Sequence, residues 1–139
     1  MGYNEIVNHK KIGEINMKVN PYLSFNGNCA EAVAFYEKAF NVKAVVEIAD
    51  EANNLVAHAE FEIDGTPIML FDAPQPVKFG DNIMIIINFD KHERADAEKA
   101  FNILKADGNV IMELGETEWS ECFGLLVDKF GIQWNICQN

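Results

Sequence analysis

The chain has 139 residues, of which 49% are hydrophobic and 24% charged, and its formal net charge is −11. This length is typical of one domain, in which folding buries roughly 68–70% of the extended chain's surface, so the core needs no metal or disulfide. The excess of carboxylates argues against binding to nucleic acids or to anionic membranes, because both require clusters of Lys and Arg.

The cysteines and the first residues indicate the compartment and the domain boundary. Cys29, Cys122 and Cys137 are far apart and form no CxxC motif. Together with the absence of a signal peptide or a long apolar run, this pattern favours a reducing, cytoplasmic location. Residues 1–16 are polar and aperiodic, so we expect them to form a tail, with a single domain over 17–139.

The first half of the domain shows the pattern of a strand, a helix and three strands. A strand is expected over 19–25, followed by a helix that Asn28 caps, with Glu31 at the capping-box position. The dipeptide Asp64-Gly65 suits a two-residue type I′ turn. The three strands after the helix are expected at 43–49, 55–63 and 66–72.

After a connector over 73–80, the same pattern occurs again. Asp90 with Glu93 suggests a second helix cap, and the helix is expected to stop at Gly108. Gly131 repeats Gly65 at an offset of about 66 residues. The expected strands lie at 82–89, 110–114, 122–127 and 132–137. We therefore predict an α+β fold of two βαβββ modules, 18–72 and 81–138.

Three segments resemble the vicinal oxygen chelate superfamily, which includes glyoxalase I, extradiol dioxygenases and bleomycin-resistance proteins. They are PYLSFNGNCAEAVAFYEKAF (21–40), HAEFEIDGTPIMLFD (58–72) and W...FG..VDKFGIQWNI (119–136). The chain is most similar to the PhnB-like branch, often labelled 3-demethylubiquinone methyltransferase-like. This resemblance implies a curved mixed sheet with a concave cup, helices on its outer face, and a homodimer.

In the metalloenzymes of this superfamily, His and Glu residues from both modules hold a divalent ion in the cup. The resemblance maps these ligand positions onto Pro21, Met69, Asn82 and Asn135. Proline has no donor atom, and thioethers and neutral amides bind divalent ions weakly, so we do not expect the standard metal site. No GxGxxG or GxxxxGK[ST] motif occurs, and no glycine-rich loop suits a methyl donor, so no cofactor is predicted.

Strand alternation predicts which side chains line the cup. A two-residue turn pairs Glu60 with Met69 and His58 with Phe71. The cup face of the first hairpin should then carry Val56, His58, Glu60, Glu62, Met69 and Phe71. In the second half, the expected cup residues are Asn82, Met84, Ile86, Cys122, Gly124, Asn135 and Cys137. Trp134 should point the other way, into the core.

His58 is the candidate catalytic residue, because imidazole titrates near neutrality and Glu60 shares its face. The alternative is an inert, hydrogen-bonded strand histidine. Trp119 either covers the pocket or packs on the rim of the sheet, and Cys122 is better explained as a small buried residue than as a nucleophile. The full predicted ligand-binding set is His58, Glu60, Met69, Phe71, Asn82, Trp119, Cys122 and Asn135.

Three functions are compatible with this sequence. The leading hypothesis is a PhnB-like protein that binds a small molecule in the cup without the standard metal and without an assigned reaction. The second is a metal-dependent enzyme with a non-standard ligand set around His58. The third is a protein-interaction module in which a partner segment fills the cup.

Overall fold

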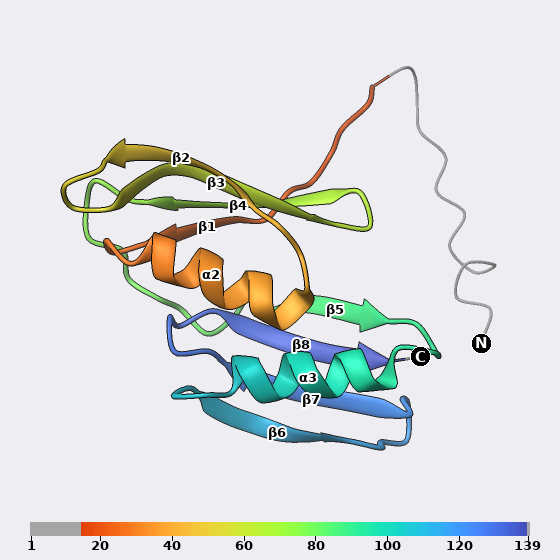
Figure 1. Ribbon diagram of the computed structural model, residues 1–139. Helices are drawn as coiled ribbons and strands as arrows, with labels where there is room; N and C mark the ends of the chain where they lie inside the picture. Colours follow the sequence, from red (N-terminus) through yellow and green to blue (C-terminus); the bar gives the residue numbers. More distant parts are fainter. Residues whose placement is uncertain (1–14, 139) are drawn as a thin grey trace.

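The computed structural model describes residues 15–138, which form two modules of the same topology (Figure 1). The predicted tail lies outside the described residues, apart from positions 15 and 16. The elements of the first module are β1 (Tyr22–Phe25), α2 (Cys29–Phe40), β2 (Val45–Asp50), β3 (Leu55–Ile63) and β4 (Thr66–Asp72). Those of the second are β5 (Ile85–Phe89), α3 (Arg94–Leu104), β6 (Asn109–Gly115), β7 (Cys122–Val127) and β8 (Gln133–Gln138).

Each module contributes one four-stranded mixed sheet with the same connectivity. The strand orders are β1-β4-β3-β2 and β5-β8-β7-β6, with β1 parallel to β4 and β5 parallel to β8. The remaining pairs are antiparallel. Helices α2 and α3 lie side by side against the two sheets (Figure 1). The predicted α+β fold with a duplicated βαβββ unit is confirmed.

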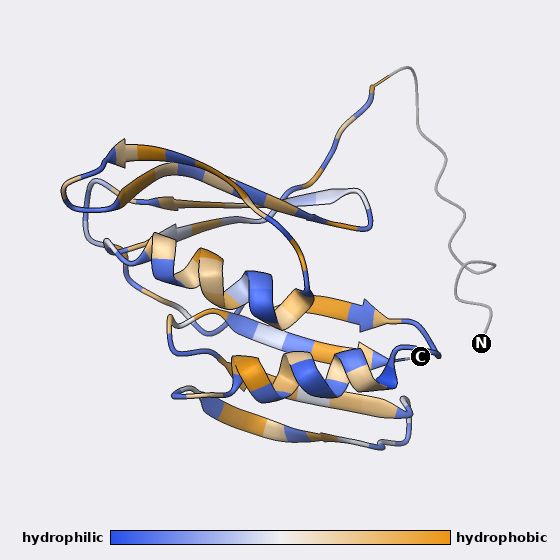
Figure 2. Ribbon diagram, viewed as in Figure 1, coloured by the Kyte–Doolittle hydropathy of each residue, from blue (hydrophilic) through white to orange (hydrophobic). Residues whose placement is uncertain are grey.

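The core lies between the helices and the sheets, and Trp134 of β8 is at its centre. Its ring centroid is 5.3 Å from that of Tyr36 and 5.1 Å from that of Phe40, both on α2. Trp134 is fully buried, as predicted. Both helices present apolar residues at 3–4 residue spacing, visible as orange bands in Figure 2. A single core therefore joins the two modules.

A buried carboxylate, that of Asp128, also joins the modules. Its Oδ2 accepts hydrogen bonds from the Tyr36 hydroxyl (2.5 Å) and from Trp134 Nε1 (2.8 Å). Its Oδ1 accepts from the backbone N–H groups of Phe130 (2.9 Å) and Ile132 (3.0 Å). Burial raises the pKa of Asp128, and these four hydrogen bonds oppose that rise. Asp128 is therefore a turn residue with a structural role across the modules.

The N-terminus of α2 is capped by a distant carboxylate and not by Asn28. Asn28 makes no side-chain cap hydrogen bond. Instead, Asp72 Oδ1 accepts from the N–H groups of Gly27 (2.9 Å) and Cys29 (3.0 Å), while Oδ2 accepts from Val56 N–H (2.9 Å). This arrangement satisfies one orphan donor of the first turn, the N–H of Cys29, and places a negative charge at the positive end of the helix.

The ends of α3 also differ from the expectation. Asp90 N–H donates to Glu93 Oε1 (2.7 Å), but this pair closes a turn before the helix, which begins at Arg94. Beyond the helix end at Leu104, the left-handed residue is Asp107 (φ 58°), not Gly108. Gly108 is required for a different reason, because a Cβ there would lie 2.3 Å from the carbonyl oxygen of Val127.

Candidate functional site

The hairpin between β3 and β4 has the predicted turn and register. Asp64 (φ 48°) and Gly65 (φ 81°) both adopt positive φ, as a type I′ turn requires. Glu60 pairs with Met69 and Ile63 with Thr66. As a result, Ala59 and Phe61 point to α2 and the core, while His58 and Glu60 lie on the opposite face.

We call this opposite side the open face of the first sheet, because no helix covers it. It carries Tyr22, Ser24, His58, Glu60, Glu62, Met69 and Phe71. Val56 was expected here but is buried in the core. The reason is an irregularity in the pairing with β2. From Glu47 to Ile48, β2 advances by one residue, whereas their partners on β3, His58 and Val56, are two residues apart. The shift reverses the alternation of side chains before His58.

A chain of polar contacts crosses the open face from β1 to β3. The hydroxyl of Tyr22 lies 3.2 Å from His58 Nδ1, and His58 Nε2 lies 3.1 Å from Glu60 Oε1. The Tyr22 ring is 4.7 Å from the Phe71 ring, centroid to centroid. The side chains of His58 and Glu60 are 34% and 39% exposed, and Tyr22 is 53% exposed. All three can therefore reach a molecule in solution.

The acceptors in this chain fix the tautomer of His58. An ionised carboxylate only accepts hydrogen bonds, so Glu60 requires a proton on His58 Nε2. In neutral imidazole, Nδ1 then carries a lone pair, which accepts the proton of the Tyr22 hydroxyl. The order of donation is Tyr22 to His58 to Glu60.

The open face is also electronegative. Glu60 lies beside Met69, Glu47 is directly opposite His58, and Glu62 is on the same face as Glu60 two residues along β3. No lysine or arginine lies in β1, β3 or β4. These strands therefore present carboxylates and no cation, and the nearby lysine is Lys78 of the connector, which lines a cavity together with Tyr22 and Ser24.

Tyr22 was not among the predicted site residues. The expected first strand began at residue 19, whereas β1 begins at Tyr22. Alternation within β1 could have identified it, since Phe25 is buried and Leu23 packs against the core. Tyr22 and Ser24 are then on the other face, in register with Met69 and Phe71.

In the second module, the predicted cup face is wrong for β7. Cys122 pairs with Gln138, Leu126 with Trp134, and Leu125 with Asn135. Cys122 and Gly124 therefore lie on the side of α3 and Trp134, not on the side of Asn135. The cause is the connection between β7 and β8, in which residues 128–132 separate the paired Val127 and Gln133. A two-residue turn fixes the register of its two strands, whereas a longer loop does not. The register predicted across this loop is wrong by one residue, which reverses the faces of the β7 side chains.

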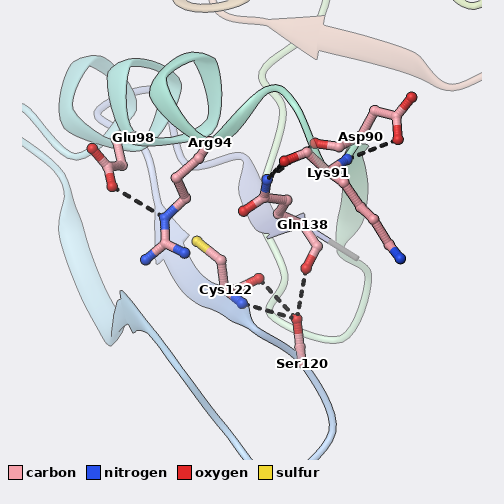
Figure 3. Close-up of polar contacts among 7 residues, drawn as sticks. All are labelled: Asp90, Lys91, Arg94, Glu98, Ser120, Cys122 and Gln138. Atoms are coloured by element: carbon pink, nitrogen blue, oxygen red, sulfur yellow. Dashed lines mark hydrogen bonds and ion pairs between the residues drawn. The ribbon is translucent and has the colours of Figure 1, made fainter.

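Figure 3 shows the surroundings of Cys122, with its sulfur directed toward α3. The thiol is fully buried, and burial raises its pKa. Ser120 Oγ lies 2.9 Å from the Cys122 carbonyl oxygen and 3.1 Å from that of Gln138. Gln138 Nε2 donates to the carbonyl of Lys91 (2.7 Å). These contacts join β7, β8 and the loop before α3, and they place Cys122 among buried groups on the side of the sheet away from Asn135.

The other predicted site residues of the second module are scattered. Asn135 is on the face of Ile86, but it is 2% exposed and donates to the Gly124 carbonyl (2.8 Å). Asn82 is exposed in the loop before β5, which begins three residues later than expected. Trp119 is 63% exposed, with its ring 5.4 Å from the Phe123 ring. The structure thus brings together His58, Glu60, Met69 and Phe71 on one sheet, whereas the remaining four belong to the second module and its loops.

The side chains at the family's metal-binding positions do not fit a divalent ion. Pro21 precedes β1 and offers only its carbonyl, which accepts from Met69 N–H (3.0 Å). Met69 pairs with Tyr22, and Asn135 pairs with Ile86. Within residues 15–138, no group of three His, Cys, Asp or Glu side chains is arranged to hold a metal. Over the same residues, no helix is long and apolar enough to span a bilayer.

This arrangement of paired modules is found in solved structures of the glyoxalase class. The fosfomycin resistance protein FosX from Listeria monocytogenes shares the fold, with a TM-score of 0.63 at 14% identity over 90% of this chain and 92% of that one. Protein PA1353 from Pseudomonas aeruginosa is more similar, with a TM-score of 0.78 and 28% identity over 89% and 98% of the two chains. The fold is therefore that of the vicinal oxygen chelate superfamily.

Sequence comparison defines the branch. The 3-demethylubiquinone-9 3-methyltransferase family matches residues 17–137. Protein YjdN of Escherichia coli K12 is 31% identical, over 86% of this chain and 94% of that protein. A PhnB protein from Bacillus cereus has a TM-score of 0.76 and 27% identity, over 88% of this chain and all of that one. The chain belongs to this family, the PhnB-like branch of the superfamily.

Proposed function

We propose that the protein binds a small molecule on the open face of the first sheet, without the standard metal. The observation that carries this proposal is the chain of contacts from Tyr22 through His58 to Glu60, flanked by Phe71. Polar groups that converge beside an aromatic wall are typical of small-ligand sites. His58 is directed away from the core, toward the face that would hold the ligand.

The ligand should be neutral or cationic and partly aromatic. Glu47, Glu60 and Glu62 disfavour an anion, while the exposed ring of Tyr22 and the half-buried ring of Phe71 offer a surface for stacking. The hydrogen-bonding groups available to it are the Tyr22 oxygen and the second carboxylate oxygen of Glu60. Any reaction of that ligand is a separate question from its binding.

The proposal includes a homodimer formed through exposed apolar strands. The outer strand β2 exposes Val45 (76%), and β6 exposes Ile111 (52%), while Ile86 on the open face of the second sheet is 57% exposed. These apolar side chains lie on strands with an unpaired edge or an uncovered face. A second copy of the chain that docks there would bury them. Sedimentation at micromolar concentration should give a species of twice 15.6 kDa, and a monomer alone would contradict this part.

A cytoplasmic location is part of the same proposal. All three cysteines are buried. Cys122 and Cys137 belong to adjacent strands but lie on opposite faces of the sheet, so they are not placed to form a disulfide. Thiols in this arrangement suit a reducing compartment.

The binding proposal is tested with ligand extracted from the purified protein and identified by mass spectrometry. The identified compound is then titrated calorimetrically into wild type, His58→Ala and the control His92→Ala. His92 is exposed in the turn before α3, so its loss should leave affinity unchanged. We expect His58→Ala to weaken binding at least about tenfold, because it releases the Tyr22 hydroxyl and the Glu60 carboxylate, the two groups that would hold the ligand. Equal affinity of all three proteins would refute the site.

A further inference from the structure

The contacts on the open face have the order of a nucleophile, a base and a group that orients the base. We propose that Tyr22 is an activated phenol that attacks neutral or cationic esters, with His58 as its proton acceptor and Glu60 as the positioning residue. This inference rests on the proposed binding site but makes a claim about chemistry that binding alone does not. It also assigns a role to Tyr22, which the sequence did not single out.

Geometry supports this assignment in two ways. The Tyr22 oxygen is 3.2 Å from His58 Nδ1, within the reach needed for proton transfer to a general base. The contact between His58 Nε2 and Glu60 Oε1 (3.1 Å) holds the imidazole in the tautomer whose lone pair is on Nδ1. A base that is oriented in this way by a third group is the usual arrangement of an activated nucleophile.

The reaction step balances without a further reagent. The Tyr22 oxygen forms a bond to the acyl carbon of the ester as its proton moves to His58 Nδ1. The bond from that carbon to the alcohol oxygen then breaks, and the leaving alcohol takes the proton from His58. The product is an acetyl- or acyl-tyrosine ester with neutral imidazole restored, and water can later hydrolyse it. Glu60 stabilises the imidazolium while it carries the proton.

Tyr22 is held in place and accessible to solvent, whereas the other described tyrosine, Tyr36, is held in place but buried. The Tyr22 ring contacts the rings of His58 (5.7 Å) and Phe71 (4.7 Å), yet more than half of the residue is exposed. Tyr36 is fully buried and donates its hydroxyl proton to Asp128, and burial raises its pKa. Tyr36 therefore provides an internal control that should stay unmodified.

The charge of the face restricts the electrophile. Glu47 and Glu62 flank the pair of His58 and Glu60. A carboxylated ester would meet three carboxylates without a cation on these strands, whereas a neutral ester would not. The substrate class is consequently a neutral or cationic carboxylic ester.

The test uses the full chain and p-nitrophenyl acetate, with release of p-nitrophenolate followed by absorbance and the acetylated residue mapped by peptide mass spectrometry. We expect one acetyl group per chain, on Tyr22, with none on Tyr36. Tyr22→Phe retains the ring against Phe71 and should abolish the adduct. His58→Ala should slow acetylation of Tyr22 about 100-fold, the lower end of what a general base contributes.

Two further measurements test the positioning role and the charge preference. Glu60→Ala should convert the His58 nitrogen spectrum from one tautomer, with the proton on Nε2, into a mixture, and a purely structural role would not predict this change. An ester with an added carboxylate should react with Tyr22 at least about tenfold more slowly than p-nitrophenyl acetate. The rate with each of the two esters is divided by the rate at which the same ester acetylates N-acetyltyrosinamide, which corrects for their different intrinsic reactivity.

The inference is overturned if the acetyl group is found on His58 or on lysines while Tyr22 is unmodified. It is also overturned if His58→Ala acetylates Tyr22 as fast as wild type does. These results do not depend on the natural ligand. Acetylation of Tyr22 without any co-purified ligand would contradict only the binding proposal, and a His58-dependent ligand with unreactive Tyr22 would contradict only this inference.

Discussion

Replacing Asp128 with Asn tests whether one buried carboxylate joins the two modules. Oδ2 of Asp128 accepts from Tyr36 of the first module and from Trp134 of the second, while Oδ1 accepts from two backbone N–H groups of its own loop. Asparagine has nearly the same shape but only one accepting oxygen. In either orientation, its NH2 group faces hydrogen-bond donors.

The loss of stability is set by the more favourable of the two orientations of the asparagine amide. If the asparagine oxygen keeps the two backbone N–H groups, the Tyr36 hydroxyl can rotate and accept, but the Trp134 indole N–H loses its acceptor. One unsatisfied buried donor costs about 1–3 kcal/mol, and exchanging a charged acceptor for a neutral one weakens the remaining bonds by about 1 kcal/mol. We expect Asp128→Asn to lower the free energy of unfolding by about 2–4 kcal/mol.

Urea denaturation followed by tryptophan fluorescence measures this loss. Trp134 is buried and Trp119 exposed, so a Trp119→Phe background gives a signal from the core alone. Asp64→Asn is the control, because Asp64 is an exposed turn residue with positive φ that asparagine tolerates. Combined with Tyr36→Phe, Asp128→Asn should show a coupling energy above about 0.5 kcal/mol. Additive effects, or a loss equal to that of the control, would refute the role of Asp128.

The same substitution changes the pH dependence. Burial raises the pKa of Asp128 above its ordinary value of 3.8, so the folded chain holds this proton more tightly than the unfolded chain does. The stability from this group is therefore fully present below pH 3.8 and is lost as pH rises through the raised pKa. The difference in stability between wild type and Asp128→Asn should narrow as pH increases across that window, and a widening difference would show that the pKa is depressed.

Three other perturbations have expected outcomes. His58→Ala should cost less than about 1 kcal/mol of unfolding free energy and Trp134→Ala about 3–5 kcal/mol, because only Trp134 is core; equal losses in urea denaturation would contradict the assigned faces. Gly108→Ala places a Cβ 2.3 Å from the Val127 carbonyl oxygen and should lower the stability by at least about 1–3 kcal/mol, whereas an unchanged urea midpoint would show that the backbone yields. A chain starting at Met17 should melt within about 4 °C of the full chain by calorimetry, and a larger shift would indicate that the residues before it pack on the domain.

The parts of the fold that were predicted from sequence depend on local chemistry. Both residues of the Asp64-Gly65 turn require positive φ, so only one register was possible for β3 and β4, and the contacts of Glu60 and Met69 followed. No equally strict rule exists for the loop over 128–132. There, Asp128 sets the geometry by accepting from the N–H groups of Phe130 and Ile132, which alternation alone does not indicate.

The parts that were missed depend on pairs distant in sequence. Asp72 replaces Asn28 as the cap of α2, although the two are more than forty residues apart, since β1 and β4 are adjacent in the sheet. Tyr22 joins the site because β1 pairs in parallel with β4, which brings its hydroxyl to His58. Alternation within β1 indicates the face of Tyr22, but the contact with His58, like that of Asp72 with α2, is fixed by the sheet order and not by a local pattern of the sequence.

The reactivity of the three cysteines offers a last test, which measures how rarely the folded domain opens to solvent. Burial raises the pKa of Cys29 to about 12, and also that of Cys122, so both thiols are protonated and covered at neutral pH. Cys137 is also buried, on the opposite face of the sheet from Cys122.

A thiol reagent such as 5,5′-dithiobis(2-nitrobenzoate) should therefore modify the three cysteines of the native protein only as fast as the chain opens. In 6 M guanidinium, roughly the range that unfolds small domains, it should modify all three at once. Asp128→Asn should speed their modification by the same factor by which it raises the equilibrium constant of unfolding. One cysteine that reacts at the rate of a free thiol in the native protein, or an intramolecular Cys122–Cys137 disulfide after mild oxidation, would show that the β7–β8 register described for this module is not the one in solution.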